Sequence, residues 1–347
     1  MSDSRVRTAV AGVPEPLSER PLGELGLVDD VSVRGSRVRV AVTGLDDDAT
    51  YRAELERAIR AAVAGRVELR HSVAGPERRQ AVALTLRRTH RRPGALGSGT
   101  KLIAVASGKG GVGKSTVTAN LAAALALDGA RVGVVDADVW GYSQTTLLGV
   151  RQAPVAVPGL MFPVRAHGVR LMSVGFFVSE GEPVVWRGPM LHKALEQFLD
   201  DVYWGELDVL LVDLPPGTGD ATMSVLGMLP DAAMVVVTTP QAAARTVAAR
   251  VGRMARDART PIAGVIENMA GDVFGTGGGE RLAGELGASL LASVPLAAEV
   301  CAAGDTGVPI VLSAPHCDAA RRLRAVGPQL PDSRPSLVGR SLPLFVS

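Results

Sequence analysis

The stretch ASGKGGVGKST, residues 106–116, decides the fold of this 347-residue chain, and it holds one lysine more than its pattern needs. Gly108, Gly113, Lys114 and Ser115 satisfy G-x-x-x-x-G-K-[ST]. In such a loop backbone N–H groups cradle phosphates, the lysine reaches the β- and γ-phosphates, and the hydroxyl binds Mg²⁺. The apolar run LIAVA (102–106) precedes the loop and a helix-length segment follows it, so the pattern predicts a nucleotide site. It leaves Lys109 unexplained.

The residues predicted to bind the nucleotide in this loop are Gly108, Lys109, Gly110, Gly111, Val112, Gly113, Lys114, Ser115 and Thr116. Beyond the loop, short apolar runs alternate with helix-length segments. The apolar runs are 102–106, 131–135, 208–212, 232–237 and 262–266. Alternation of this kind predicts an α/β fold with a mostly parallel sheet flanked by helices, and the loop motif indicates that this fold is a P-loop NTPase. Ligands of such sheets bind at the carboxyl ends of the strands.

The N-terminal part of the chain has a different pattern. Two alternating runs within 28–42, an amphipathic segment ending at Gly65 and the run 66–73 predict a small α+β domain over 1–75. Residues 76–100 are arginine-rich and then Gly/Pro/Ser-rich, which predicts a short basic helix in a flexible linker. A solvated linker face is favoured over a nucleic-acid site, because no aromatic side chains interleave. The ATPase domain is expected over 101–330 and a tail over 331–347.

Bulk composition excludes several classes of protein. The formal net charge is +2, and the start of the chain lacks an apolar core and a cleavage pattern typical of a secretory signal. We therefore expect a cytoplasmic protein with no membrane or nucleic-acid partner. Cys301 and Cys317 are the two cysteines of the chain, too few for a disulfide framework. Packed or idle reduced thiols are the simpler interpretation of both.

Three aspartates close apolar strands beside the loop. Asp213 is predicted to hold Mg²⁺ through water, as a Walker B residue does. Asp138 is the candidate for orienting the attacking water, and Asp136 for supporting the metal shell. Strand-end capping and turn formation are the alternative for all three. The segment 215–220 (PPGTGD) after Asp213 could sense the γ-phosphate.

The sequence KGGVGKST, with its early lysine, resembles the deviant Walker A signature of MinD/ParA-type ATPases. In that group the lysine reaches across a homodimer interface to the partner's nucleotide. The resemblance therefore implies that Lys109 is a phosphate ligand acting in trans and that ATP stabilises a homodimer. A solvated loop lysine is the alternative.

The chain resembles the Mrp (ApbC) family of iron–sulfur cluster carrier ATPases. The resemblance lies in the motifs DADVWGYS, WRGPM, DLPPGTGDATMSV, VVTTPQ and VIENM, which follow one another in the order typical of that family. The N-terminal residues resemble the small domain that precedes the ATPase in bacterial members. This resemblance implies ATP, Mg²⁺ and an iron–sulfur cluster as ligands, with apoprotein recipients or other assembly proteins as partners. It also implies that Asn268 reads the adenine edge and that Pro295 packs against the base.

The chain departs from this family in its cysteines. Most members carry C-x-x-C shortly after ENM, where this sequence reads ENMAGDVFGTGGG. Thiolates are the usual protein ligands of such clusters, so Cys301 and Cys317 are weak candidates. The carrier function is predicted, and an ATP-dependent dimeric switch or scaffold that has lost the cluster is the alternative. A positioning ATPase acting on membrane or DNA ranks last. Slow intrinsic hydrolysis is expected, because no water-positioning glutamine or arginine finger is obvious near the loops.

Overall fold

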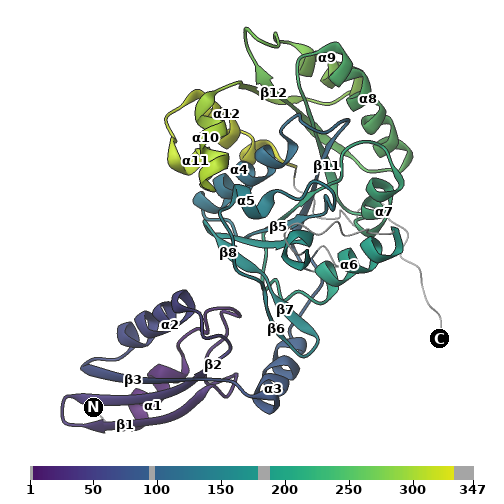
Figure 1. The fold of residues 1–347 in the computed structure, drawn as a ribbon. Helices are drawn as coiled ribbons and strands as arrows, with labels where there is room; N and C mark the ends of the chain where they lie inside the picture. Colours follow the sequence, from purple (N-terminus) through teal and green to yellow (C-terminus); the bar gives the residue numbers. More distant parts are fainter. Residues whose placement is uncertain (1–2, 94–97, 179–187, 332–347) are drawn as a thin grey trace, which may run out of the picture. The chain divides into compact units, whose positions relative to one another are not determined.

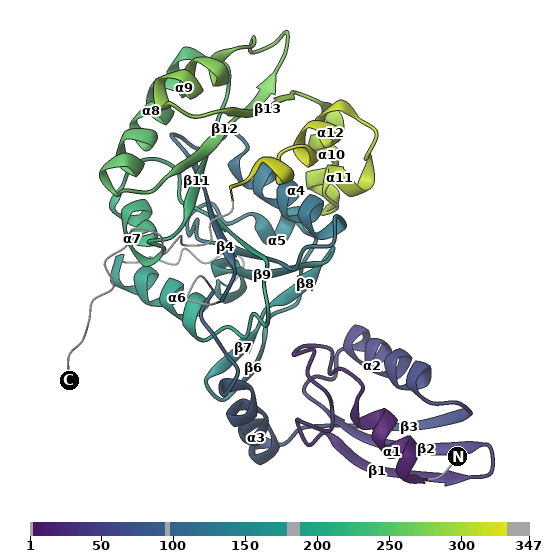
Figure 2. The ribbon, with the colours of Figure 1, turned by 180° about the vertical axis from the view of Figure 1, so that it is seen from behind.

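The computed structural model describes residues 3–93, 98–178 and 188–331. The chain forms two compact units (Figures 1 and 2). Unit 1 comprises Met1–Arg91, Ala153–Pro163 and Asp201–Gly205, and unit 2 comprises Arg92–Gln152, Val164–Asp200 and Glu206–Ser347. Trp186 and Arg187 of the WRGPM motif, and all of the predicted tail except Pro331, lie outside the described residues.

Unit 1 is an α+β unit around a three-stranded sheet of order β1-β2-β3. Strands β1 and β2 form an antiparallel hairpin, and β3 returns parallel to β2 after helix α2, whose N-terminus is capped by the Asp48 side chain. The hairpin, helix and third strand predicted from the sequence are confirmed. The elements of unit 1 are α1 (Asp3–Ala11), β1 (Val28–Arg34), β2 (Arg37–Gly44), α2 (Ala49–Ala62), β3 (Arg66–Val73), α3 (Pro76–Arg87), β6 (Val155–Val157) and β7 (Leu160–Phe162).

Two short pieces from later in the chain return to unit 1. Strands β6 and β7 form a two-stranded hairpin, and Phe162 and Tyr203 share a buried core with Leu86 of α3. Arg79 and Arg87 of α3 donate to the backbone carbonyls of residues 156 and 159, at 3.0 and 2.9 Å. The units therefore divide the chain at other residues than the predicted domains, since α3 of the predicted linker packs with unit 1.

Unit 2 is built on an eight-stranded sheet of order β13-β12-β11-β4-β10-β5-β9-β8. Every neighbouring pair is parallel except β8 and β9. The predicted α/β fold with a mostly parallel sheet is confirmed. Its strands are β4 (Lys101–Ser107), β5 (Val132–Asp136), β8 (Val164–Ala166), β9 (Val169–Ser173), β10 (Val209–Asp213), β11 (Ala233–Thr238), β12 (Ile262–Ala270) and β13 (Leu290–Pro295).

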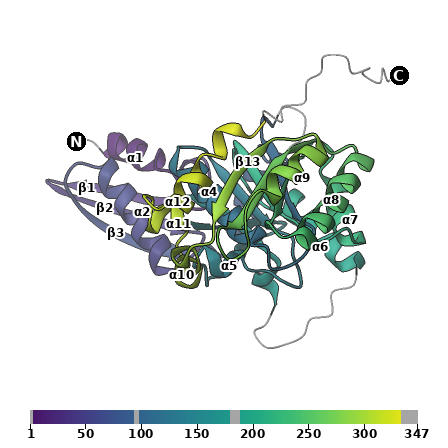
Figure 3. The ribbon, with the colours of Figure 1, turned by 90° about the horizontal axis from the view of Figure 1, so that it is seen from above.

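Helices cover both faces of this sheet, as Figure 3 shows from above. Helices α4, α5 and α10–α12 lie on one face and α6–α9 on the other. The helices of unit 2 are α4 (Lys114–Leu127), α5 (Gln144–Leu147), α6 (Gly188–Asp200), α7 (Asp220–Met228), α8 (Ala242–Asp257), α9 (Gly278–Leu286), α10 (Ala298–Thr306), α11 (Ile310–Ser313) and α12 (Asp318–Arg324), with 3-10 turns at Val174–Phe177 and Gly327–Gln329.

The central strands β4, β5, β10 and β11 are almost completely buried. Burial on both faces explains why these strands are continuous apolar runs and not alternating ones. The carboxyl ends of β4, β5 and β10 lie side by side in register, with Asp213 opposite Asp136. That edge places the phosphate loop beside two strand-end carboxylates. Within the described parts of the chain, none of the helices has the length and apolar character needed to span a membrane.

Candidate nucleotide site

The phosphate loop joins the end of β4 to the start of α4. Gly111 and Gly113 take left-handed φ values of 80° and 81°, a region that favours glycine. A Cβ on Gly113 would also lie 2.2 Å from Nδ2 of Asn268. No side chain caps the N-terminus of α4, so the first N–H groups of this 14-residue helix are available to an anion. The loop has the local structure that its sequence pattern predicts.

Lys114 places a positive charge among carboxylates. Its side chain is 6% exposed, and Nζ forms an ion pair with Oδ1 of the fully buried Asp213. The same nitrogen lies 3.8 Å from Oδ2 of Asp138 and 3.4 Å from Oγ of Ser115. The structure therefore brings together Lys114, Asp213, Asp138 and Ser115 as the sequence pattern predicts. A phosphate group that takes the Lys114 ammonium must compete with Asp213 for it.

Asp136 is fully buried beside this ion pair. Its Oδ2 accepts hydrogen bonds from the backbone N–H groups of Ser143 and Gln144 and from the hydroxyl of Ser173, each at 3.1 Å. Burial and then the neighbouring charge of Asp213 raise the pKa of Asp136 above its usual range. Asp136 thus fixes the chain that runs from β5 into α5. A role in the metal shell stays a prediction for this residue.

Asp138 lies closer to the cavity of the loop. Burial raises its pKa, while the positive charge of Lys114 lowers it. Its Oδ1 accepts the N–H of Gly141 at 3.1 Å. A carboxylate with a raised pKa is a better proton acceptor, which suits a group that orients water or accepts its proton. The assignment of Asp138 to the attacking water stays a prediction.

A cavity of 480 Å³ lies over the loop. Its walls include the loop from Lys109 to Thr116, together with Asp138, Trp140 and Pro216. Ser115 contributes a hydroxyl, and no cluster of three or more His, Cys, Asp or Glu side chains suited to a metal occurs in residues 3–93, 98–178 and 188–331. This donor set fits Mg²⁺, which binds through one or two protein ligands, water and nucleotide phosphates. It also fits the triphosphate, through the N–H groups of α4 and Lys114.

Three other predicted residues are placed as follows. Lys109 is exposed on the loop and lines the cavity. Asn268 is buried, and its Nδ2 donates to the carbonyl of Val112 at 2.9 Å, so it supports the loop from below. Pro295 ends β13 and is partly exposed. The adenine contacts implied for Asn268 and Pro295 stay predictions.

Sequence reasoning missed Gln144 and Trp140. Gln144 follows Asp136 by eight residues and has 0% exposure, and its Nε2 donates to Oδ2 of Asp213 at 2.9 Å. Trp140 is 68% exposed and lines the cavity. The DADVWGYSQ segment contains both residues, but only the fold shows that α5 returns Gln144 to the end of β10.

The segment after Asp213 is held close to the loop. The N–H of Gly217 donates to the carbonyl of Ser107 at 2.8 Å. The hydroxyl of Thr222 lies 3.2 Å from the carbonyls of Pro215 and Gly217. These bonds connect the 215–220 segment to the end of β4, next to the phosphate loop. Sensing of the γ-phosphate by this segment stays a prediction.

The two cysteines lie away from the phosphate loop in sequence and differ in environment. Cys301 is exposed on α10. Cys317 is half-buried at the N-terminus of α12, where its Sγ accepts the N–H of Ala320 at 3.3 Å. In the region after ENM, Gly271 and Gly275 exchange two backbone hydrogen bonds and close a tight turn over residues 272–274. That turn contains no thiol.

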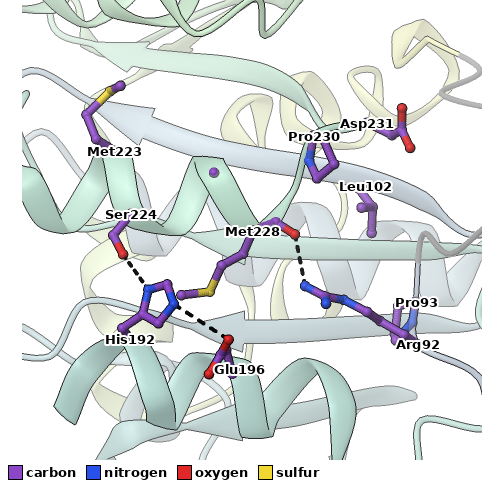
Figure 4. A pocket seen from close by; sticks show the side chains of 11 residues that line it. Arg92, Pro93, Leu102, His192, Glu196, Met223, Ser224, Met228, Pro230 and Asp231 are labelled. Carbon is purple, nitrogen blue, oxygen red and sulfur yellow. Dashed lines mark hydrogen bonds and ion pairs between the residues drawn. The ribbon is translucent and has the colours of Figure 1, made fainter. Parts of the chain in front are cut away.

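A second cavity of 780 Å³ lies beside helices α6 and α7 (Figure 4). His192 of α6 hydrogen-bonds the hydroxyl of Ser224 on α7 at 2.8 Å, and its other ring nitrogen lies 3.6 Å from Glu196. Arg92 donates to the carbonyl of Met228 at 3.0 Å. The His192–Ser224 bond joins α6 to α7, and Arg92 joins the segment before β4 to the end of α7.

Comparisons with known proteins agree with this geometry. A family model described as ParA, NUBPL iron-transfer P-loop NTPase, matches residues 99–330. A protein of Mycobacterium tuberculosis (strain ATCC 25618 / H37Rv) named iron-sulfur cluster carrier protein is 44% identical over 368 residues, covering 99% of this chain and 96% of the relative. One of the same name from Bacillus subtilis (strain 168) is 41% identical, covering 85% and 88%.

Solved structures match the fold of unit 2. The nucleotide-binding protein of Archaeoglobus fulgidus, in complex with ADP, is 32% identical with a TM-score of 0.53, covering 67% of this chain and 90% of that chain. The septum site-determining protein MinD of Pyrococcus horikoshii OT3, complexed with Mg-ADP, is 25% identical with a TM-score of 0.52, covering 66% and 94%.

The ion pair of Lys114 leads to a prediction about stability. Lys114→Met should lower the free energy of unfolding, measured by urea denaturation without nucleotide, by about 3 kcal/mol, because it leaves buried carboxylates without their cation. The loss should be larger at pH 8 than at pH 5, where protons on the carboxylates with raised pKa replace the missing charge.

The matched control is Lys109→Met, which removes a charge from an exposed position of the same loop. Its unfolding free energy should equal that of the wild type. Equal stability of the two variants at pH 8 would contradict the assigned role of the Lys114–Asp213 pair.

Proposed function

This chain belongs to the ParA-type family of iron-transfer P-loop NTPases, and we propose that it uses ATP to carry iron–sulfur clusters to apoproteins. The resemblance drawn from its motifs is thereby confirmed at the level of the family. The observation that carries the proposal is the cluster of Lys114, Asp213, Asp138 and Ser115 at the carboxyl ends of β4, β5 and β10. The proposed cargo, an iron–sulfur cluster, is supported by relatives that are named iron-sulfur cluster carrier protein and that match most of this chain.

Each group of the site has a part in the proposed ATP hydrolysis. Lys114 and the N–H groups of α4 bind phosphate oxygens. Ser115 and Asp213 would hold Mg²⁺, which would supply positive charge to the β- and γ-phosphates when bound, and Asp136 fixes the surrounding chain. Asp138 orients the attacking water. Turnover by the protein alone is slow, on the order of 10⁻³–10⁻⁴ s⁻¹, as in P-loop hydrolases without an arginine finger.

Lys109 is the residue proposed to couple ATP binding to homodimer formation. It is exposed, and no ion pair to its side chain occurs among the described residues. An exposed ammonium on the rim of a phosphate site is placed to bind a nucleotide held by a second copy of the chain. Two copies that each lend Lys109 to the other would form a homodimer that depends on ATP.

Lys109→Ala should abolish ATP-dependent dimerisation, measured by sedimentation velocity with a slowly hydrolysed ATP analogue and Mg²⁺. Monomer folding and binding of ADP should change little, because Lys114 still contacts the phosphates. Arg250→Ala, which removes an exposed charge from α8, serves as the control and should dimerise like the wild type. Dimerisation of the Lys109 variant at wild-type concentrations would refute the trans role.

An iron–sulfur cluster needs protein ligands, and the positions of the two cysteines limit where this chain can bind one. Iron–sulfur clusters are usually held by four thiolates, and two copies of this chain together carry four cysteines. Cys301 is exposed and accessible to a cluster, whereas the thiol of Cys317 is engaged at the start of α12. We infer that Cys301 is the stronger candidate of the two for a cluster ligand.

Anaerobic reconstitution with iron and sulfide tests this assignment. The wild type should bind iron and sulfide in stoichiometric amounts per dimer, and Cys301→Ser together with Cys317→Ser should remove them. Cys317→Ser alone should retain more cluster than Cys301→Ser alone. Both ATP binding and dimerisation should persist in all variants, since neither cysteine lies in the phosphate loop. Equal iron content in the wild type and the double variant would rule out these ligands.

One observation favours the alternative function, an ATP-dependent dimeric switch or scaffold that has lost its cluster. The region where relatives are expected to carry C-x-x-C is a tight turn closed between Gly271 and Gly275, and it contains no thiol. Absence of cluster from the wild type in the same reconstitution, with dimerisation intact, is the result that selects this alternative.

A further inference from the structure

Gln144 places a buried side-chain amide behind the phosphate loop. It begins helix α5 and is completely buried. Its Nε2 donates two hydrogen bonds, one of 2.9 Å to Oδ2 of Asp213 and one of 3.0 Å to the backbone carbonyl of Ser115. One side chain therefore connects the aspartate after β10 with the serine of the phosphate loop.

The orientation of this amide follows from its neighbours. Both groups that face Nε2 are acceptors, a carboxylate and a carbonyl, so a rotated amide would place oxygen against oxygen. Oε1 then points to a place where it finds no hydrogen-bond partner among the described residues, although it is buried. An unpaired buried oxygen costs stability, by about 1–3 kcal/mol.

That cost sets Gln144 apart from an ordinary core residue. A leucine or methionine has nearly the same volume and carries no unpaired acceptor of its own, but it would leave the Asp213 carboxylate and the Ser115 carbonyl without this donor. What the glutamine adds is its donor pair toward Asp213 and Ser115. Its backbone is held independently, because the N–H of Gln144 donates to Asp136 at 3.1 Å. The amide is thus delivered to Asp213 by a segment that is itself fixed.

Asp213 uses its two oxygens for different neighbours. Oδ2 accepts from Gln144, whereas Oδ1 pairs with Lys114 and lies 3.4 Å from the hydroxyl of Thr118. A hydrogen bond on Oδ2 opposes rotation of the carboxylate and leaves Oδ1 directed to the phosphate loop.

We propose that Gln144 is a positioning residue for Mg²⁺·nucleotide: it holds Asp213, through Oδ2, in the orientation in which the carboxylate serves the metal beside Ser115. The inference rests on the proposed metal role of Asp213. It differs from the water-positioning glutamine of other P-loop hydrolases, because Gln144 is buried behind the cavity and does not line it.

The test measures ADP affinity by calorimetry at a series of Mg²⁺ concentrations and in EDTA. Gln144→Met should raise the Mg²⁺ concentration needed for half of the metal-dependent gain in affinity about tenfold, the loss expected for one hydrogen bond to a charged group. Affinity in EDTA should stay within about twofold of the wild type, because Lys114 and the N–H groups of α4 are intact. If Gln144 had a purely structural role, Gln144→Met would weaken ADP binding equally in Mg²⁺ and in EDTA.

Asn120→Leu is the control for loss of a buried amide. Asn120 lies on α4, where it donates to the carbonyl of Thr116 and accepts from the N–H of Val311. Asn120→Leu should lower the thermal midpoint without changing the Mg²⁺ dependence of ADP affinity, so a changed Mg²⁺ dependence in Gln144→Met is not explained by lost stability alone. If the ADP affinity of the wild type depends on Mg²⁺ and Gln144→Met needs the same Mg²⁺ concentration, the positioning role of Gln144 is refuted while the metal role of Asp213 stands. A wild type whose ADP affinity ignores Mg²⁺ overturns the metal role of Asp213 as well.

Discussion

The ion pair between Lys114 and Asp213 is the interaction on which the site depends. Both side chains are buried at the carboxyl edge of a parallel sheet, and two further aspartates lie near them. One cation among three carboxylates leaves the group short of positive charge. Burial makes that shortage expensive, which is why the pKa values of Asp136 and Asp138 are raised. Mg²⁺ supplies the kind of charge that this arrangement lacks.

The same shortage explains how the surrounding fold is arranged. Asp136 accepts hydrogen bonds from the backbone of the segment that leads into α5 and from the hydroxyl of Ser173 at the end of β9. That segment carries Asp138 and Trp140 to the cavity and Gln144 to Asp213. On the other side, Asn268 of β12 supports the phosphate loop through Val112. The ends of β5 and β10 thus meet the phosphate loop at Lys114, and β12 supports that loop.

The sequence predicted much of this site because its elements are local. A strand, a glycine-rich loop and a helix are adjacent in the chain, and the aspartates are marked by the apolar runs that they end. Gln144 was beyond such reasoning, since its partner Asp213 is 69 residues away and only the order of strands brings them together. The packing of β6, β7 and Tyr203 in unit 1 was not predicted for the same reason. Long-range packing leaves no local mark in the sequence.

The central claim, that Asp213 and the nucleotide compete for Lys114, can be tested by measuring ADP affinity of Asp213→Asn in EDTA. Without Mg²⁺, Asp213 has no metal to bind, and its ion pair with the Lys114 ammonium competes with the phosphates of ADP. The variant should bind ADP about tenfold more tightly than the wild type in EDTA and gain little affinity from added Mg²⁺. Equal or weaker binding by the variant in EDTA would contradict the claim.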